Sequence, residues 1–450
     1  MTNFIGWKVI KNGNYKINDL PNLSDEELIL VGKICVEFSE FAKDESNINE
    51  NRAREIISLI LKKNLEKNKI IVEDEQREYL EKYVFQATFG YGPLTDILED
   101  DSLEEIAIIG LNKPIYVFIR EKGWLDTNVM FTERENLIDI INKMARKIGR
   151  RITLQNPRLN AILPDGSRMH ATIEPVSELE VTIRKFRQKP IDVKDLIKIG
   201  YTYESLAFLW TVFQNDKNVI ICGNTAAGKT TTLNALFSFI DLNERIILLE
   251  ETPEIQIPHS HVIKMKTNSN IEIGMKELIE DSLRMRPDRV IIGEVRTKQE
   301  IRAMIESMNT GQARGCYATM HANNTKELIS RMRYNEIIPS DILSIDLIVI
   351  QKRYLQFNGD GNKSIEIRRV FEICELVEIN NSIQIRPIFK LDPKLGRIVK
   401  TMAKSKIIED LAYSNGLEEK VIEKEIERKS KYLKEKIKSD NLIDEIQKYK

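Results

Sequence analysis

The stretch Val219-Ile220-Ile221-Cys222-Gly223-Asn224-Thr225-Ala226-Ala227-Gly228-Lys229-Thr230-Thr231 decides the fold of this 450-residue chain. Its four leading apolar residues predict a short buried strand, and residues 223–230 match G-x-x-x-x-G-K-[ST] at every required position. Residues 231–240 have the spacing of an amphipathic helix. This order is typical of a phosphate-binding loop, because two glycines let successive N–H groups point into one concavity at the positive end of the helix.

The residues of this loop are expected to bind a nucleoside triphosphate. Lys229 would reach the β- and γ-phosphates, and the Thr230 hydroxyl would ligate Mg²⁺. The sequence has no N-K-x-D motif, so guanine specificity is not indicated. The predicted ligands are therefore ATP and Mg²⁺, and the predicted binding residues are Gly223, Asn224, Thr225, Ala226, Ala227, Gly228, Lys229, Thr230 and Thr231.

Strands and helices alternate downstream of the loop, which predicts a parallel sheet with crossover helices. Residues 245–249 form one expected strand, which ends at Glu250-Glu251. Residues 287–296 form another, which delivers Glu294 at its carboxyl end. Ligands of such sheets collect outside these ends, so Glu294 can act on Mg²⁺ or on the attacking water. The predicted metal ligands are Thr230 and Glu294.

The overall composition limits the partners and the cellular compartment that are expected for the protein. Lysines and arginines (68) nearly balance aspartates and glutamates (69), so no global charge favours nucleic acid or an anionic membrane. The four cysteines form no C-x-x-C pair, which argues against a zinc site or a disulfide framework and favours a reducing cytosol. No apolar run approaches the ~20 residues that cross a bilayer. We therefore expect a cytoplasmic protein that could serve a membrane machine from its inner face.

The pattern along the chain predicts five regions. Ser24 and Glu27 suggest a capped helix near the start, and Asp165-Gly166 between apolar runs signals a hairpin turn. The expected regions are a helical N-terminal extension over 1–80, an α/β domain over 81–187, a hinge linker over 188–202, a phosphate-loop ATPase domain over 203–400 and a charged helical tail over 401–450.

Three further side chains are ambiguous by spacing alone. Arginines near turns, such as Arg168 and Arg184, are more often surface residues or carboxylate partners than catalytic groups. A lone histidine such as His321 is more often structural, although its place at a strand end suits a sensor of the γ-phosphate.

These pieces in this order resemble the secretion-superfamily ATPases of type II and type IV secretion, type IV pili and the archaellum. The resemblance runs from Gly90 to Val377 and rests on seven motifs: Gly92-Pro-Leu94 with the acidic stretch after it, Leu163-Pro-Asp-Gly-Ser-Arg168, Ile183-Arg-Lys-Phe186, the phosphate loop, the Asp box at 249–254, Arg286-Pro-Asp with Gly293-Glu294-Val-Arg296, and the His box ending at His321. It implies hexameric rings in which an N-terminal α/β domain caps a RecA-like domain and nucleotide binds at their junction.

The resemblance also implies roles for individual residues. Glu250 and Glu294 would position magnesium and water, and His321 would be catalytic. Arg168 and Arg184 match the arginines that reach the nucleotide from the N-terminal domain, with Arg151 a weaker candidate.

The sequence departs from the family pattern at two positions. The usual Glu-Asp of the Asp box is Glu250-Glu251, which keeps the charge but lengthens one side chain. The first histidine of the His box is Gln312, which can hydrogen-bond but cannot carry a positive charge. The four-cysteine zinc insert of many type II secretion members is absent from this sequence.

The sequence therefore predicts a cytoplasmic Mg²⁺-dependent ATPase, a homo-hexamer peripheral to the inner face of the cell membrane. It would dock on a polytopic membrane protein and drive filament assembly or secretion. One alternative is a RecA-like nucleic-acid translocase, which the balanced charge disfavours. Another is a nucleotide-gated scaffold that does not hydrolyse ATP.

Overall fold

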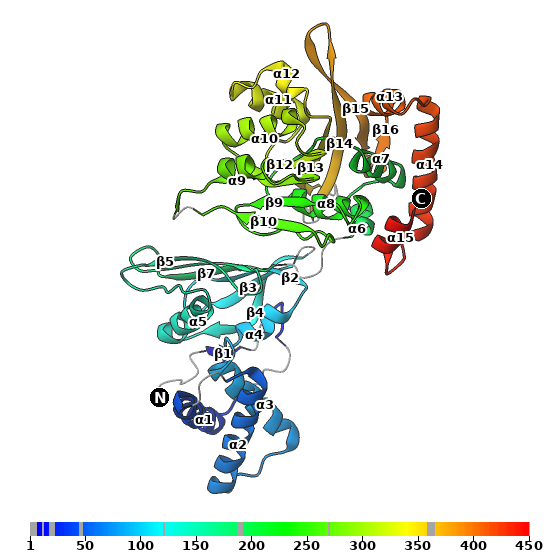
Figure 1. The fold of residues 1–450 in the computed structure, drawn as a ribbon. Coiled ribbons are helices and arrows are strands. Elements are labelled where there is room, and N and C mark those ends of the chain that lie inside the picture. The colour runs from blue at the N-terminus through cyan, green and yellow to red at the C-terminus, as the bar shows by residue number, and fades with distance from the viewer. Residues whose placement is uncertain are drawn as a thin grey trace. The chain divides into compact units, whose positions relative to one another are not determined.

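The computed structural model describes residues 7–10, 13–17, 23–44, 48–119, 122–186, 192–268, 271–357 and 365–449. The chain divides into two compact units, Met1–Gln188 and Lys189–Lys450 (Figure 1). Each unit has its own sheet and its own buried core.

The first unit combines a seven-stranded antiparallel sheet with helices. The strand order is β1-β4-β3-β2-β7-β6-β5. The strands are β1 (Trp7–Val9), β2 (Leu103–Ile108), β3 (Pro114–Ile119), β4 (Gly123–Phe131), β5 (Arg158–Ile162), β6 (Arg168–Ile173) and β7 (Leu179–Arg184). The helices are α1 (Asp25–Asp44), α2 (Glu50–Asn68), α3 (Asp74–Thr88), α4 (Leu94–Glu99) and α5 (Arg134–Arg146).

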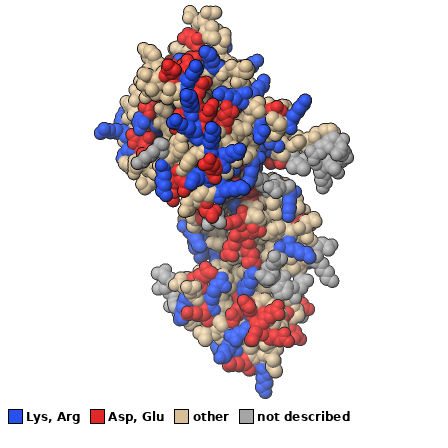
Figure 2. All heavy atoms as spheres, turned by 90° about the vertical axis from the view of Figure 1, so that its right-hand side faces the viewer, with Lys and Arg blue, Asp and Glu red and all other residues tan. Residues whose placement is uncertain are grey.

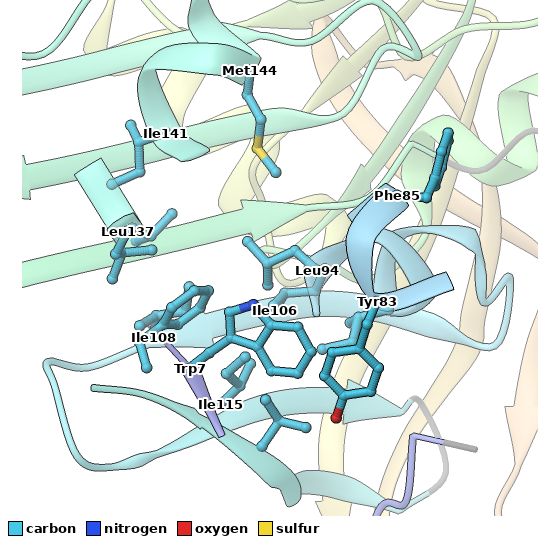
Figure 3. Packing of buried hydrophobic residues seen from close by; sticks show 14 of the residues in the cluster. Trp7, Tyr83, Phe85, Leu94, Ile106, Ile108, Ile115, Leu137, Ile141 and Met144 are labelled. Carbon is cyan, nitrogen blue, oxygen red and sulfur yellow. The ribbon is translucent and has the colours of Figure 1, made fainter. Parts of the chain in front are cut away.

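One continuous core joins the helices of this unit to its sheet. Trp7 of β1 stacks on Tyr83 of α3 with ring centroids 4.9 Å apart. The same core contains Ile106 and Ile115 of the sheet and Met144 of α5 (Figure 3). The sequence boundary expected at residue 80 therefore falls inside α3, a helix whose buried side chains belong to this shared core.

The helix cap and the hairpin turn that the sequence predicts in the first unit are both present in the structure. The Ser24 hydroxyl accepts from the Glu27 amide, while the Glu27 carboxylate accepts from Ser24, so the two cap the start of α1. The predicted turn at Asp165-Gly166 is confirmed, because Ile162 of β5 pairs with Arg168 of β6 across it. Gly166 has φ +89°, a left-handed conformation that glycine adopts without steric cost.

The second unit is built on a nine-stranded sheet with the order β10-β9-β11-β12-β8-β13-β14-β15-β16. The first six of these strands are parallel to their neighbours, and the last three pair antiparallel. This parallel core confirms the predicted α/β class. The strands are β8 (Val219–Gly223), β9 (Ile246–Glu250), β10 (Val262–Lys266), β11 (Arg289–Val295), β12 (Gly315–Met320), β13 (Leu347–Gln356), β14 (Ile365–Ile379), β15 (Ser382–Asp392) and β16 (Arg397–Lys400).

Helices cover both faces of this sheet. Side chains of β8 alternate between the two cores, with Val219 and Ile221 in one and Ile220 and Cys222 in the other. Strands buried on both faces read as continuous apolar runs, as β8 does. One face carries α6 (Val193–Lys198), α7 (Tyr203–Gln214), α8 (Lys229–Leu236), the 3₁₀ turn Phe237–Phe239, α13 (Lys406–Ser414), α14 (Glu419–Lys436) and α15 (Leu442–Lys448). The other carries α9 (Met275–Ser282), α10 (Lys298–Thr310), α11 (Thr325–Tyr334) and α12 (Pro339–Ile342).

The expected hinge and the expected charged tail both contain side chains that are buried in the second unit. Residues 188–191 of the expected hinge lie outside the described residues, but Val193 and Leu196 of α6 are buried in the core of the second unit. The charged tail is more than a solvated surface, since Ile426, Lys429 and Leu433 of α14 are buried. The α14 contacts with α7 attach the tail to the sheet domain.

Candidate active site

Four neighbouring parallel strands bring the predicted site residues to one edge of the sheet. The order β9-β11-β12-β8 places these strands side by side. Glu250 ends β9, Glu294 lies near the end of β11, His321 follows β12 and the phosphate loop follows β8. Carboxyl ends of parallel strands are where ligands of α/β sheets bind. Topology alone therefore gathers these residues.

The phosphate loop has the backbone that its glycines predict. Gly228 is the N-cap of α8 with φ +90°, and Ala226 also has a positive φ of +59°. A Cβ at Gly223 would lie 2.3 Å from the carbonyl oxygen of Gln351, so the pairing of β8 with β13 requires glycine there. The first N–H groups of a helix lack partners within the helix. Those of α8 are therefore free of helical partners and can donate hydrogen bonds to an anion in the loop.

Lys229 is buried beneath the loop, with 7% of its surface exposed. Its Nζ donates to the carbonyl oxygens of Gly223 (3.2 Å) and Asn224 (3.4 Å). It also lies 3.9 Å from Oε1 of Glu294. Burial lowers the pKa of this ammonium, and the Glu294 carboxylate opposes that shift.

Glu294 is the centre of the charged cluster. His321 Nε2 lies 2.6 Å from its Oε1, and Arg296 Nε donates to its Oε2 at 2.7 Å. Burial disfavours ionisation of Glu294, but Arg296, His321 and Lys229 outweigh it and lower the pKa. The carboxylate is therefore ionised and held by donors on two sides.

An irregularity in β11 aims the Glu294 side chain. The register with β12 shifts between Ile292 and Val295, which leaves Gly293 and Glu294 out of the regular pairing. Thr319 of β12 donates to the Gly293 carbonyl at 2.6 Å and fixes this segment. β-Bulges commonly redirect a side chain next to a functional site. Here the displaced residue is the carboxylate itself.

Both the backbone and the ring of His321 are held by hydrogen bonds, the ring by Glu294 and the backbone by Arg331. Arg331 of α11 donates to the His321 carbonyl at 2.8 Å and to the Arg296 carbonyl at 3.3 Å. Burial lowers the pKa of the imidazole, Lys229 lowers it further, and Glu294 opposes both. A neutral ring that carries its proton on Nε2 donates to the carboxylate.

The two glutamates after β9 have different environments. Glu250 is buried, and its Oε1 accepts from the backbone N–H groups of Glu254 (2.8 Å) and Ile255 (2.9 Å). Burial raises the pKa of Glu250 to about 7, against those two hydrogen bonds. Glu251 is exposed and forms an ion pair with Arg296. Arg296 therefore bridges the ends of β9 and β11.

Gln312 lies away from this cluster, and the three arginine candidates belong to the other unit. Gln312 precedes β12, at the end of the strand opposite to His321, and is exposed. Arg168 and Arg184 belong to the first unit, where they pair directly across β6 and β7. Arg151 is exposed in the loop between α5 and β5 of that unit.

Sequence reasoning assigned no role to Arg296, Arg331 or Arg368. Arg296 had a usable signal, because residues two apart on a strand share a face and Glu294 is two positions away. Arg331 and Arg368 had none, because Arg331 reaches back from the next helix to a carbonyl ten residues earlier and Arg368 reaches a loop 142 residues earlier. Arg368 of β14 donates to the Ala226 carbonyl of the phosphate loop at 2.7 Å.

The donor chemistry of the cluster fits a magnesium ion bound together with phosphate. Mg²⁺ keeps several waters and takes one or two carboxylates plus substrate phosphates, so a dense protein cage is not required. Thr230 follows the loop lysine and Glu294 contacts that lysine, so a hydroxyl and a carboxylate are available beside the phosphate loop. Within the described residues, no group of three or more histidine, cysteine, aspartate or glutamate side chains is placed to hold a metal by itself.

Among the described segments, no helix combines the length and apolarity that a membrane span requires.

Comparison with known proteins identifies similar chains. A model of the family described as Type II/IV secretion system protein matches residues 90–435. An uncharacterized protein of Methanocaldococcus jannaschii is 30% identical over 386 residues, which cover 82% of this chain and 68% of that protein. A second uncharacterized protein of that organism is 42% identical over 246 residues, but the match covers 52% of this chain and only 34% of the relative.

More distant similarities come from named secretion proteins. The type IV secretion system protein VirB11 of Bartonella quintana is 29% identical over 282 residues, covering 53% of this chain and 78% of VirB11. Among solved structures, the Legionella pneumophila ATPase DotB has a TM-score of 0.44 and 19% identity, covering 63% of this chain and 79% of that one. The VirB11 ATPase of Brucella suis, in complex with sulphate, has a TM-score of 0.31 and 22% identity, covering 63% and 92%.

Proposed function

Because the chain belongs to the type II/IV secretion system protein family, we propose that it is a Mg²⁺-dependent ATPase that powers a type IV pilus-like, archaellum-like or secretion machine. The observation that carries this proposal is the cluster of Lys229, Glu294 and His321 at the mouth of a phosphate loop. Such a cluster matches the requirements of phosphoryl transfer, where catalysis is positioning plus electrostatic stabilisation.

Each residue has a role that follows from its surroundings. The amides of the loop and the Lys229 ammonium would bind the β- and γ-phosphates. Thr230 and Glu294 would hold Mg²⁺, which neutralises charge that develops on the phosphates. The ionised Glu294 would orient the attacking water, and the neutral His321 would hold Glu294 through its Nε2 proton.

Glu250 has a supporting role in this proposal. Its carboxyl accepts two backbone N–H groups of the loop after β9, so it fixes the segment that carries Glu251. Since Glu250 lies beside Gly293, with its Cγ 3.1 Å from where a Cβ would be, it packs directly against the displaced part of β11. It would therefore position water and metal through Glu294.

The cellular role is proposed from family membership. We infer that the protein works as a homo-hexamer at the cytoplasmic face of the cell membrane and docks on a polytopic membrane protein. The described face that carries α13 and α14 has lysines and arginines interspersed with aspartates and glutamates (Figure 2). A mixed face gives no single-sign field for nucleic acid, and the whole chain, with 68 lysines and arginines and 69 aspartates and glutamates, has no strong net charge. A protein substrate or filament is therefore favoured over DNA.

The first test compares ATP hydrolysis by the wild type and by Lys229→Ala. The variant should lose turnover and keep its circular dichroism spectrum, because Lys229 is the only side-chain cation in the 223–231 segment. Hydrolysis near the wild-type rate in the variant would contradict the assignment. Hydrolysis that requires DNA would favour a nucleic-acid translocase, and tight ATP binding with slow single turnover would favour a nucleotide-gated scaffold.

A further inference from the structure

The strands β13 and β14 run past the phosphate loop and are tied to it. Gly223 at the end of β8 pairs with Gln351 of β13. The Asn224 side chain then continues this pairing, because its amide donates to the Arg353 carbonyl (2.7 Å) and its carbonyl accepts from the Arg353 N–H (2.8 Å). An asparagine side chain thus substitutes for one more backbone pair where the strand has ended.

A second link comes from β14. Arg368 pairs directly with Arg353 across the two strands, so both side chains lie on the same face. Glu366 lies 3.6 Å from Arg353 and 3.9 Å from Arg368 and offsets their repulsion. Only 11% of the Arg368 side chain is exposed, and its Nε donates to the Ala226 carbonyl at 2.7 Å.

Ala226 is the residue of the loop whose conformation most needs support. Its φ of +59° is a left-handed value that a non-glycine residue adopts only with backbone strain. The peptide group between Ala226 and Ala227 is held at both ends, since its N–H donates to the Asn224 carbonyl (3.1 Å) and its C=O accepts from Arg368. This peptide cannot rotate unless both hydrogen bonds break.

We propose that Arg368 is a positioning residue for nucleotide binding, which holds the phosphate loop in its anion-binding conformation before the nucleotide arrives. The inference rests on the proposed function, because it concerns the same loop. Arg368 acts through the Ala226 carbonyl and needs no contact with phosphate. Holding a loop in its bound conformation raises affinity by reducing the cost of ordering it.

Arg369 provides a matched control on the same strand. It is the next residue, so its side chain points to the opposite face, and it donates to the Gly396 carbonyl beside β16. Both arginines hold one backbone carbonyl, but only Arg368 holds the phosphate loop. A general weakening of β14 would affect both variants alike.

The experiment measures MgADP binding to the full chain by calorimetry for the wild type, Arg368→Met and Arg369→Met. Arg368→Met should bind about 10- to 100-fold more weakly, the scale of a lost charge-assisted hydrogen bond, while Arg369→Met stays within about twofold. Hydrogen exchange of the amides in 225–231 should accelerate in Arg368→Met alone.

The outcomes separate this inference from the proposed function. A wild type that does not bind MgADP would overturn the proposed function and the inference with it. A wild type that binds, with equal affinity in Arg368→Met and unchanged exchange in the loop, would overturn the inference alone. If Arg368→Met does not fold, Arg368→Gln decides, since its shorter amide should weaken binding about threefold or more and wild-type affinity would contradict the proposal.

Discussion

At the scale of single residues, the phosphate loop could be predicted because the spacing of its glycines and lysine in the sequence determines its backbone conformation. Gly223 and Gly228 are at the two positions where a side chain would clash or where φ is positive. The irregularity at Gly293-Glu294 had no sequence signal, because a register shift depends on the partner strand β12. Arg368 was missed for the same reason, since its hydrogen bond to the phosphate loop joins elements that are far apart in the sequence.

Glu294 should act in chemistry more than in binding. Its carboxylate is ionised and held by Arg296 and His321, so Glu294→Gln keeps the shape but removes the negative charge. We expect the variant to bind ATP and hydrolyse it at least ~10²-fold more slowly, the scale of a lost general base or positioning group. Equilibrium binding and single-turnover hydrolysis measure the two effects separately. Loss of nucleotide binding, or normal turnover, would contradict this role.

His321 should matter more than Gln312 for hydrolysis. His321 donates to Glu294, whereas Gln312 is exposed at the other end of β12. His321→Ala should therefore lower kcat by tenfold or more, on the order of one lost hydrogen bond to a charged group. Gln312→Ala should have a smaller effect in the same steady-state assay. Equal or reversed losses would contradict this ranking of the two residues.

At the scale of elements, hydrophobic periodicity predicted the buried strands of the sheet. It missed elements whose burial depends on the segments that pack against them. The strand predicted over 245–249 matches β9 closely, because its residues form an apolar run that is fully buried. The strands β15 and β16 at one end of the sheet were not predicted, since their many exposed residues give a weak alternation. Helix α14 was predicted only as part of a charged tail, because most of its residues are charged and even the face that packs on α7 contains a lysine.

That lysine gives the stability of the second unit a pH dependence. Lys429 donates to Thr211 and Gln214 and lies 5.2 Å from the centroid of the Trp210 ring. Burial lowers its pKa from the ordinary 10.5 to about 8, with Glu425 opposing the shift. Between these two values the unfolded chain binds a proton that the folded chain has released. The cost of burying the charge is therefore fully present below pH 8 and disappears as the pH rises towards 10.5.

Lys429→Met should remove this dependence. The free energy of unfolding of the wild type, relative to the variant, should rise by roughly 1–3 kcal/mol between pH 7 and pH 10. Urea unfolding monitored by fluorescence at several pH values measures the difference, and Lys434→Met on the same helix serves as the control. A wild-type minus variant difference that stays flat across this range would mean that Lys429 remains charged in the fold.

At the scale of the whole molecule, the order of motifs predicted the family and the class of fold, but the limits of the units depended on packing. The division after Gln188 assigns α1, α2 and α3 to the same unit as the antiparallel sheet. Helix α6 belongs to the second unit through Val193 and Leu196. Shared cores of this kind arise from contacts between distant segments, which composition along the chain does not reveal.

The sheet of the first unit contains a cross-strand pair of arginines, an arrangement that lowers stability. Arg168 and Arg184 are directly opposite each other on β6 and β7, and like charges at such positions repel. Glu105 of β2 is opposite Arg184 on the other side and offsets part of this repulsion. Two arginines side by side on one sheet face have the charge that recognition of an anion requires. This agrees with the family resemblance, which implies that both reach the nucleotide.

We therefore predict that Arg168 and Arg184 contribute to turnover although they lie outside the unit that contains the phosphate loop. An arginine that stabilises the transferring phosphoryl group can contribute on the order of 10³ in rate. Arg168→Ala and Arg184→Ala should depress kcat more than nucleotide affinity, while Arg158→Ala, an exposed arginine on the same sheet, should leave both unchanged. A chain that begins at Lys189 keeps α6 and should lose most turnover. If that chain hydrolyses ATP as fast as the full protein, the first unit supplies no part of the chemistry, and the roles predicted for Arg168 and Arg184 are wrong.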